Sequence, residues 1–134
     1  NETDEKKFKE NIETLKNIGA EVSLFIDPNR ESIERSKYLG ATSVELHTGQ
    51  YAIDYELGNH EDEYNKLVDA ANLANSLTLK VNAGHGLNYD NLGQILKLPH
   101  LNELNIGHAI IAESVFIGLD DAIKKIRRII DNCD

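Results

Sequence analysis

Apolar residues along this chain follow two different spacings, which alternate from one segment to the next. Where they recur every three or four positions, as Phe8, Ile12 and Leu15 do, they predict a helix with one apolar face. Short apolar or alternating runs, such as Val22 to Ile26, predict strands. Helices are predicted at residues 4–18, 29–40, 64–77, 91–97, 108–117 and 123–130, and strands at residues 22–26, 43–47, 79–82 and 103–106. The polar stretch at residues 50–62 has no predicted element, and the nearly all-apolar helix at 108–117 is expected to be buried.

Strand and helix alternate four times in this order, which is typical of a parallel sheet joined by helical crossovers. Four βα units are half of a (β/α)8 barrel. We therefore predict an α/β fold of the TIM-barrel family. Residues 1–134 are expected to form a single domain that covers about the last four βα units, a half-barrel.

One side of the predicted strands is polar, and this favours a barrel over an open sheet. The residues on this side include Glu45, His47, Lys80, Asn82, Glu103 and Asn105. Open parallel sheets are usually apolar on both faces, whereas a closed barrel can line a site with polar side chains. Because buried charges are tolerated only when they are paired, we expect Lys80 to lie within reach of Glu45 and Glu103.

Two predicted strands end in nearly the same motif. The third runs through Asn82 to Gly84, His85 and Gly86, and the fourth runs through Asn105 to Gly107 and His108. Glycine lets the backbone turn sharply or approach a ligand closely. Parallel α/β folds place their chemistry at the carboxyl ends of their strands. The two histidines are therefore candidate site residues.

Composition narrows the classes of partner. The chain of 134 residues carries a formal net charge of -9, which argues against nucleic acid and anionic membranes as partners. The single cysteine, Cys133, allows no internal disulfide, which fits a reducing compartment. The chain begins with Asn1 in a charged helical pattern, which suggests a fragment of a longer protein.

Four segments carry a resemblance to a known family. They read VSLFIDP, VELHTGQYA, LKVNAGHGLNYDN and LPHLNELNIGHAIIAESVFIGLDDAI, and they resemble the C-terminal half of bacterial pyridoxine 5'-phosphate synthase. The similarity extends from about Ile18 to Ile130. The resemblance implies a cytoplasmic (β/α)8 barrel that forms homo-oligomers from dimers and uses no metal or organic cofactor.

The same resemblance implies an activity and the residues that carry it. The family is a transferase of vitamin B6 biosynthesis that condenses 1-deoxy-D-xylulose 5-phosphate with 3-amino-2-oxopropyl phosphate, giving pyridoxine 5'-phosphate, phosphate and water. It implies that His85 is the proton donor and that Gly86, Gly107 and His108 contact the aminoketone phosphate. The family chain is about twice as long, and its N-terminal strands carry a further histidine and glutamate. This chain alone is therefore expected to be inactive and to need the N-terminal half as a partner.

The residue types agree with such chemistry. Ring closure from two phosphorylated ketones moves protons at several steps, and histidine is suited to transfer protons near neutral pH. Gly107 and His108 open a predicted helix, where free N–H groups and the helix dipole favour phosphate. Glu45 and His47 share one strand and their roles are open, while His60 and His100 are expected at the surface.

Two other classes of function fit the same residues. His47, His85 and His108 all follow strands and could form a three-histidine zinc site of a hydrolase. Their spacing permits such a site, but no H-x-H or H-E-x-x-H motif is present. The chain could also be a non-catalytic half-barrel that pairs with its missing half or with itself.

Overall fold

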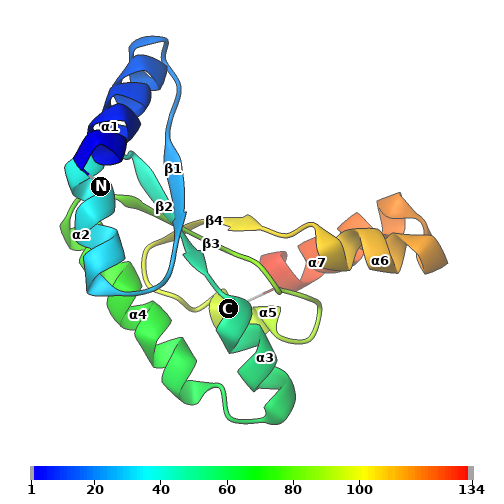
Figure 1. The fold of residues 1–134 in the computed structure, drawn as a ribbon. Coiled ribbons are helices and arrows are strands. Elements are labelled where there is room, and N and C mark those ends of the chain that lie inside the picture. The colour runs from blue at the N-terminus through cyan, green and yellow to red at the C-terminus, as the bar shows by residue number, and fades with distance from the viewer. Residues whose placement is uncertain (1, 133–134) are drawn as a thin grey trace.

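The computed structural model describes the backbone of residues 2–132 and the side chains of residues 5–132, so Cys133 lies outside the described residues. Figure 1 shows a twisted sheet with helices packed beside it. The elements in chain order are α1 (Glu2–Asn17), β1 (Ser23–Ile26), α2 (Arg30–Leu39), β2 (Ser43–His47), α3 (Gly49–Leu57), α4 (Glu61–Ser76), β3 (Lys80–Gly84), α5 (Leu92–Ile95), β4 (Leu101–Asn105), α6 (His108–Ile117) and α7 (Leu119–Asp131).

The strands form one parallel sheet in the order β1-β2-β3-β4. This confirms the predicted alternation of strands and helices, and each predicted strand lies within two residues of the observed one. The α/β fold with a four-stranded parallel sheet is consistent with part of a TIM barrel. Because all four strands run the same way, their carboxyl ends meet at one end of the sheet.

The core lies on the side of the sheet that the helices cover. Val44 and Leu46 of β2 are fully buried there, and Leu67 of α4 is 1% exposed. The small residues Ala71 and Ala74 of α4 are fully buried as well, which lets this helix approach the strands closely. This packing fixes β2 and β3 at the centre of the sheet.

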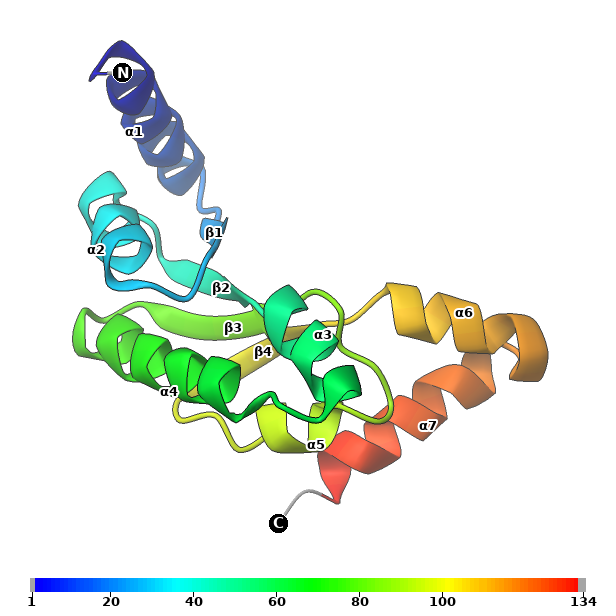
Figure 2. The same cartoon turned by 60° about the horizontal axis from the view of Figure 1, so that its bottom comes forward.

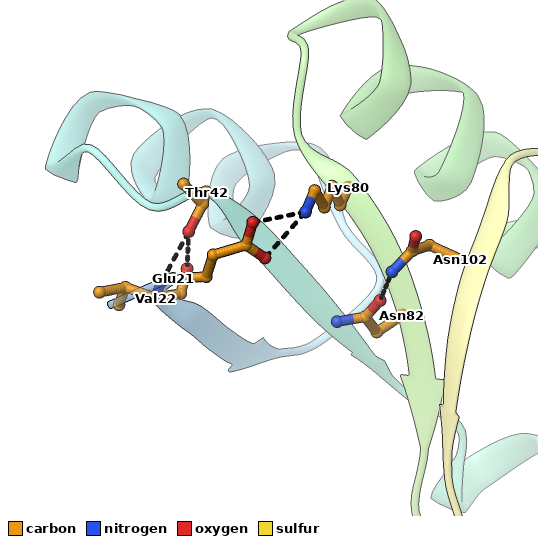
Figure 3. A network of polar contacts seen from close by, with 6 residues as sticks. All are labelled: Glu21, Val22, Thr42, Lys80, Asn82 and Asn102. Carbon is orange, nitrogen blue, oxygen red and sulfur yellow. Dashed lines mark hydrogen bonds and ion pairs between the residues drawn. The ribbon is translucent and has the colours of Figure 1, made fainter. Parts of the chain in front are cut away.

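The opposite face of the sheet is polar, as predicted. Glu45 stands beside Asn82 in register, and Asn82 stands beside Glu103. The side chain of Asn82 is buried, and its Oδ1 accepts a hydrogen bond of 3.1 Å from Asn102 (Figure 3).

The predicted cluster of Lys80 with Glu45 and Glu103 is wrong. Nζ of Lys80 instead contacts both carboxylate oxygens of Glu21, at 2.6 and 2.8 Å (Figure 3). Lys80 is the first residue of β3 and pairs in register with Ser43, so it lies at the amino end of the sheet. Glu45 lies on the neighbouring strand and two residues further along it, an offset of roughly 6–7 Å in the strand direction, and so lies nearer the carboxyl end.

The expected burial of the helix at residues 108–117 is also wrong. No residue of α6 is buried, and Val115 and Phe116 are 78% and 85% exposed. Figure 2 shows α6 extending beyond the sheet next to α7. The reason is that β4 is an edge strand, so the chain that leaves it meets no further strand and packs mainly on α7.

The segment at residues 50–62 contains a helix that the apolar pattern did not predict. Helix α3 buries Tyr51 and Ala52 and ends at Gly58, whose φ of 75° is left-handed. His60 is half-buried rather than at the surface, because its ring packs 4.6 Å from that of Tyr55. His100 is exposed, as predicted.

Among residues 2–132, no helix is both long enough and apolar enough to cross a bilayer.

Candidate active site

A cavity of about 690 Å³ opens at the carboxyl ends of the central strands. The four residues proposed from the sequence, His85, Gly86, Gly107 and His108, all line it. They come from two segments that follow β3 and β4, so the parallel register brings them together. The two histidine motifs therefore line one cavity.

His85 has an unusual backbone conformation at the rim of this cavity. Its φ is 82°, in the left-handed region that residues with a side chain rarely adopt. Its imidazole lies 4.8 Å from that of His47, measured between ring centroids, with the two planes tilted by 37°. The Phe25 ring contacts both imidazoles, with its centroid 5.0 Å from that of His47 and 6.1 Å from that of His85. These aromatic contacts therefore support the His85 ring on one side, while the residue itself stays exposed.

Two glycines leave room for this arrangement. A Cβ on Gly49 would lie 2.8 Å from Cε1 of His47 and 3.1 Å from Cδ2 of His85. Gly86 has a φ of 76°, and a Cβ there would lie 2.8 Å from the Cβ of Ala52. The backbone of α3 therefore approaches the His85 loop more closely than any side chain would allow.

Hydrogen bonds from α3 and from the loop itself hold the segment after β3. The Tyr51 hydroxyl donates to the carbonyl oxygen of Asn91 at 2.8 Å, and the Asn91 amide donates to that of Gly86 at 3.1 Å. Burial raises the pKa of Tyr51 above its usual range, so its hydroxyl remains a donor. The buried Thr48 hydroxyl donates to the carbonyl oxygens of Gly84 and His85. These hydrogen bonds hold the backbone of the segment that follows β3 in place.

Glu45 reaches the same cavity from β2. Its Oε2 accepts a hydrogen bond of 2.6 Å from the side-chain amide of Asn105. A Cβ on Gly84 would collide with Oε1 of this carboxylate. Glycine at that position therefore makes the space that the carboxylate occupies. The sequence placed Glu45 on the polar face, and the structure adds that it lies in the cavity.

The second motif, at Gly107 and His108, has more open space around it. Gly107 precedes the first turn of α6, and its carbonyl oxygen accepts from the N–H of Ile111 at 3.0 Å. A Cβ on Gly107 would meet nothing within 4 Å. The N–H groups of the first helical turn have no partner within an α-helix, and a glycine before them offers no capping side chain. This end of the cavity can accept an anion through backbone donors.

The three-histidine zinc site does not form. His47 and His85 lie together, but among the side chains of residues 5–132 no three His, Cys, Asp or Glu groups converge closely enough to hold a metal ion. The geometry thus gives no support to the metallohydrolase.

Sequence reasoning overlooked Thr48, Tyr51 and Asn105, which orient the other residues of the site. Thr48 and Tyr51 act on backbone 36 and 40 positions away, so no local spacing reveals them. Asn105 was recognised as polar, but its contact with Glu45 spans 60 positions. The one available signal was the place of Thr48 directly after the strand that ends at His47.

Comparison with known proteins identifies the family. The model of the family described as pyridoxal phosphate biosynthesis protein PdxJ matches residues 1–132. The pyridoxine 5'-phosphate synthase of Sulfurihydrogenibium sp. (strain YO3AOP1) is 48% identical over 93% of this chain and 51% of its own length. The synthases of Chlorobium phaeobacteroides and Coxiella burnetii (strain RSA 493 / Nine Mile phase I) are each 47% identical, over 92% and 87% of this chain and 52% and 48% of theirs.

This chain spans about half the length of the curated relatives it matches. The match nevertheless runs through all four strands and both histidine motifs. The chain therefore belongs to the PdxJ family of pyridoxal phosphate biosynthesis proteins.

Proposed function

We propose that this chain supplies the C-terminal half of a pyridoxine 5'-phosphate synthase active site. The complete site would condense 1-deoxy-D-xylulose 5-phosphate with 3-amino-2-oxopropyl phosphate, releasing pyridoxine 5'-phosphate, phosphate and water. The observation that supports this most strongly is the single cavity lined by His85, Gly86, Gly107 and His108. Proton-transfer and phosphate-binding groups thereby face the same space.

His85 acts as the proton donor in this proposal. The condensation needs imine formation, loss of water and loss of phosphate, and each step protonates an oxygen or a carbon. The His85 ring is exposed at the cavity and rests on His47, so one ring nitrogen can reach a bound substrate. Glu45 places a carboxylate in the same cavity, where it can stabilise the positive charge of an iminium.

Gly107 and His108 hold the phosphate of the aminoketone. The free N–H groups of the first turn of α6 provide directional donors, and the helix dipole favours a dianion there. Gly86 lines the cavity at the β3 side and allows the substrate to lie against backbone. No metal or organic cofactor takes part in the proposed reaction.

The proposed site is completed by a second half-barrel. β1 and β4 are the edges of the sheet, and an open edge pairs readily with another strand. The exposed apolar side chains of α6, among them Ile111 and Phe116, also favour a covering partner. We propose that the N-terminal half of the family barrel pairs with these edges and that the assembly is a cytoplasmic homo-oligomer.

The test is to restore the missing half. Residues 1–134 would be produced together with the N-terminal half of the Sulfurihydrogenibium relative, an assembly that we call the completed barrel. We expect the completed barrel to form pyridoxine 5'-phosphate from the two phosphorylated substrates, and residues 1–134 alone to form none. Size-exclusion chromatography should show association or aggregation of residues 1–134 rather than a sharp monomer peak.

Two outcomes would count against this proposal. A stable completed barrel that forms no product would favour the non-catalytic half-barrel. A cooperative, monomeric and active 134-residue chain would show that no second half is needed.

A further inference from the structure

Thr48 is a buried polar residue that the proposed chemistry leaves unused. It is fully buried between the end of β2 and the start of α3. Its hydroxyl lies 2.7 Å from the carbonyl oxygen of Gly84 and 2.6 Å from that of His85. A hydroxyl carries one hydrogen, so Thr48 shares a single donor between two successive carbonyl groups. The backbone N–H of Thr48 adds a third contact, to the Gly84 carbonyl at 2.9 Å.

The two carbonyl groups converge on this hydroxyl where the backbone conformation is strained. His85 is left-handed, with φ of 82°. A residue with a side chain in that conformation costs of order 1–3 kcal/mol and persists only where its surroundings enforce it. Thr48 anchors the peptide groups before and after the His85 Cα, so it acts directly on the torsion that carries the strain.

The left-handed turn decides where the imidazole lies. With this φ, the His85 ring stacks beside His47 at the cavity rim. A relaxed negative φ would turn the Cα–Cβ bond of His85 away from this position. Placement errors of about 1 Å at a reacting group can cost roughly 10²-fold in rate.

We propose that Thr48 is the positioning residue for His85: its hydroxyl holds the left-handed turn that aims the imidazole into the cavity. Because Thr48 is fully buried, it touches no substrate and acts only through His85. This inference rests on the proposed role of His85 as proton donor.

The test compares two substitutions in the completed barrel. Thr48→Val keeps the shape of the side chain and removes the donor, whereas Thr48→Ser keeps the donor and removes a methyl group. We expect Thr48→Val to lower kcat by about 10²-fold with the KM of both phosphorylated substrates nearly unchanged. Thr48→Ser should keep kcat within about 3-fold of the parent protein. This is expected if the hydroxyl, rather than the packing of the side chain, positions His85.

A second readout does not depend on activity. The intraresidue Overhauser effect between the amide and α protons is strong when φ is left-handed, because the two protons are then close. We expect it to be strong at His85 in the parent protein and Thr48→Ser, and weak in Thr48→Val. Thr78 has a φ of 63° and lies outside this contact, so its signal should stay strong in all three proteins and serves as the control.

The two readouts separate the possible failures. If Thr48→Val lowers only the thermal midpoint and both kcat and the His85 signal stay normal, the positioning role is wrong and Thr48 is structural. If the parent completed barrel forms no product, the proposed function fails, and the Overhauser signal alone decides whether Thr48 holds the turn. A weakened signal with unchanged kcat would overturn the link between the turn and catalysis.

Discussion

The two histidine motifs share nearly the same letters and differ in almost every structural respect. Gly84, in the first, is buried between Glu45 and the backbone of Asn105. Gly107, in the second, is exposed and has nothing within 4 Å of its missing side chain. His85 adopts a left-handed turn, whereas His108 begins helix α6. The backbone of the first motif is enclosed at Gly84, although His85 itself is exposed to the cavity, and the second motif is open.

The difference comes from the place of each strand in the sheet. β3 has a strand on each side, and α3 packs over its end, so neighbours determine the path of its loop. β4 is an edge strand, so the chain after it follows its own helical preference. The comparison shows that a short motif acquires its role from the neighbours that surround it. The division of roles that we propose follows this contrast, with proton transfer at the first motif and phosphate binding at the open helix end.

The largest expected contrast is kinetic. In the completed barrel, His85→Asn keeps similar bulk but cannot transfer a proton near neutral pH. We expect kcat to fall by about 10²–10⁴-fold with KM nearly unchanged, because the phosphates are held elsewhere. Gly107→Val should instead raise the KM of the aminoketone substrate and change kcat little, because its side chain would hinder the approach of the phosphate to the backbone donors at the start of α6. Steady-state kinetics and thermal midpoints on the same preparations would show whether the two variants respond alike, which would contradict this division of roles.

A contrast in stability follows from the two glycines. Gly84→Ala puts a methyl group against the Glu45 carboxylate and 2.9 Å from the Asn105 carbonyl oxygen. Overpacking of this kind costs about 1–3 kcal/mol, so the free energy of unfolding should fall by that amount. Gly107→Ala places its methyl group in open space and should change it by less than about 0.5 kcal/mol. Denaturant titration of both variants checks this, and equal effects would show that the motifs are equally enclosed.

The smallest contrast concerns backbone strain. Replacing His85 with Gly removes the left-handed penalty, and we expect the protein to become about 1 kcal/mol more stable while losing activity. His108→Gly introduces glycine into the first turn of a helix and should cost up to about 1 kcal/mol. Thr78→Gly, at a second left-handed position, is the matched control and should also stabilise. A loss of stability in His85→Gly alone would mean that its side chain contributes more than the strain costs.

The sequence was sufficient for features that depend on local pattern. The strands, the polar face of the sheet and the shared location of the two histidine motifs all follow from spacing and from the common direction of parallel strands. His85 was predicted as a site residue because glycine flanks it and a strand precedes it. Its left-handed φ was not, since that depends on Thr48 and on the close approach of α3.

Other predictions were wrong because the features they concern depend on which neighbouring elements are present. The apolar composition of α6 predicted burial, but burial requires a covering surface, and an edge strand supplies none here. Lys80 was assigned to Glu45 and Glu103 from charge alone, whereas its position at the amino end of β3 places it against Glu21. The apolar pattern did not predict helix α3, because this helix buries few residues, chiefly Tyr51 and Ala52, in an otherwise polar stretch.

We propose that one cavity joins the two motifs, with phosphate at Gly107 and His108 and the reacting carbonyl at His85. The most direct measurement is a two-ligand titration of the isotope-labelled completed barrel, followed by nuclear magnetic resonance. Inorganic phosphate should shift only the backbone amides at the start of α6. Dihydroxyacetone phosphate, which adds a ketone, should shift those amides and the His85 imidazole with one common Kd. Chemical-shift changes confined to residues 50–62, or a His85 imidazole signal that does not change with the phosphorylated ketone, would contradict this proposal.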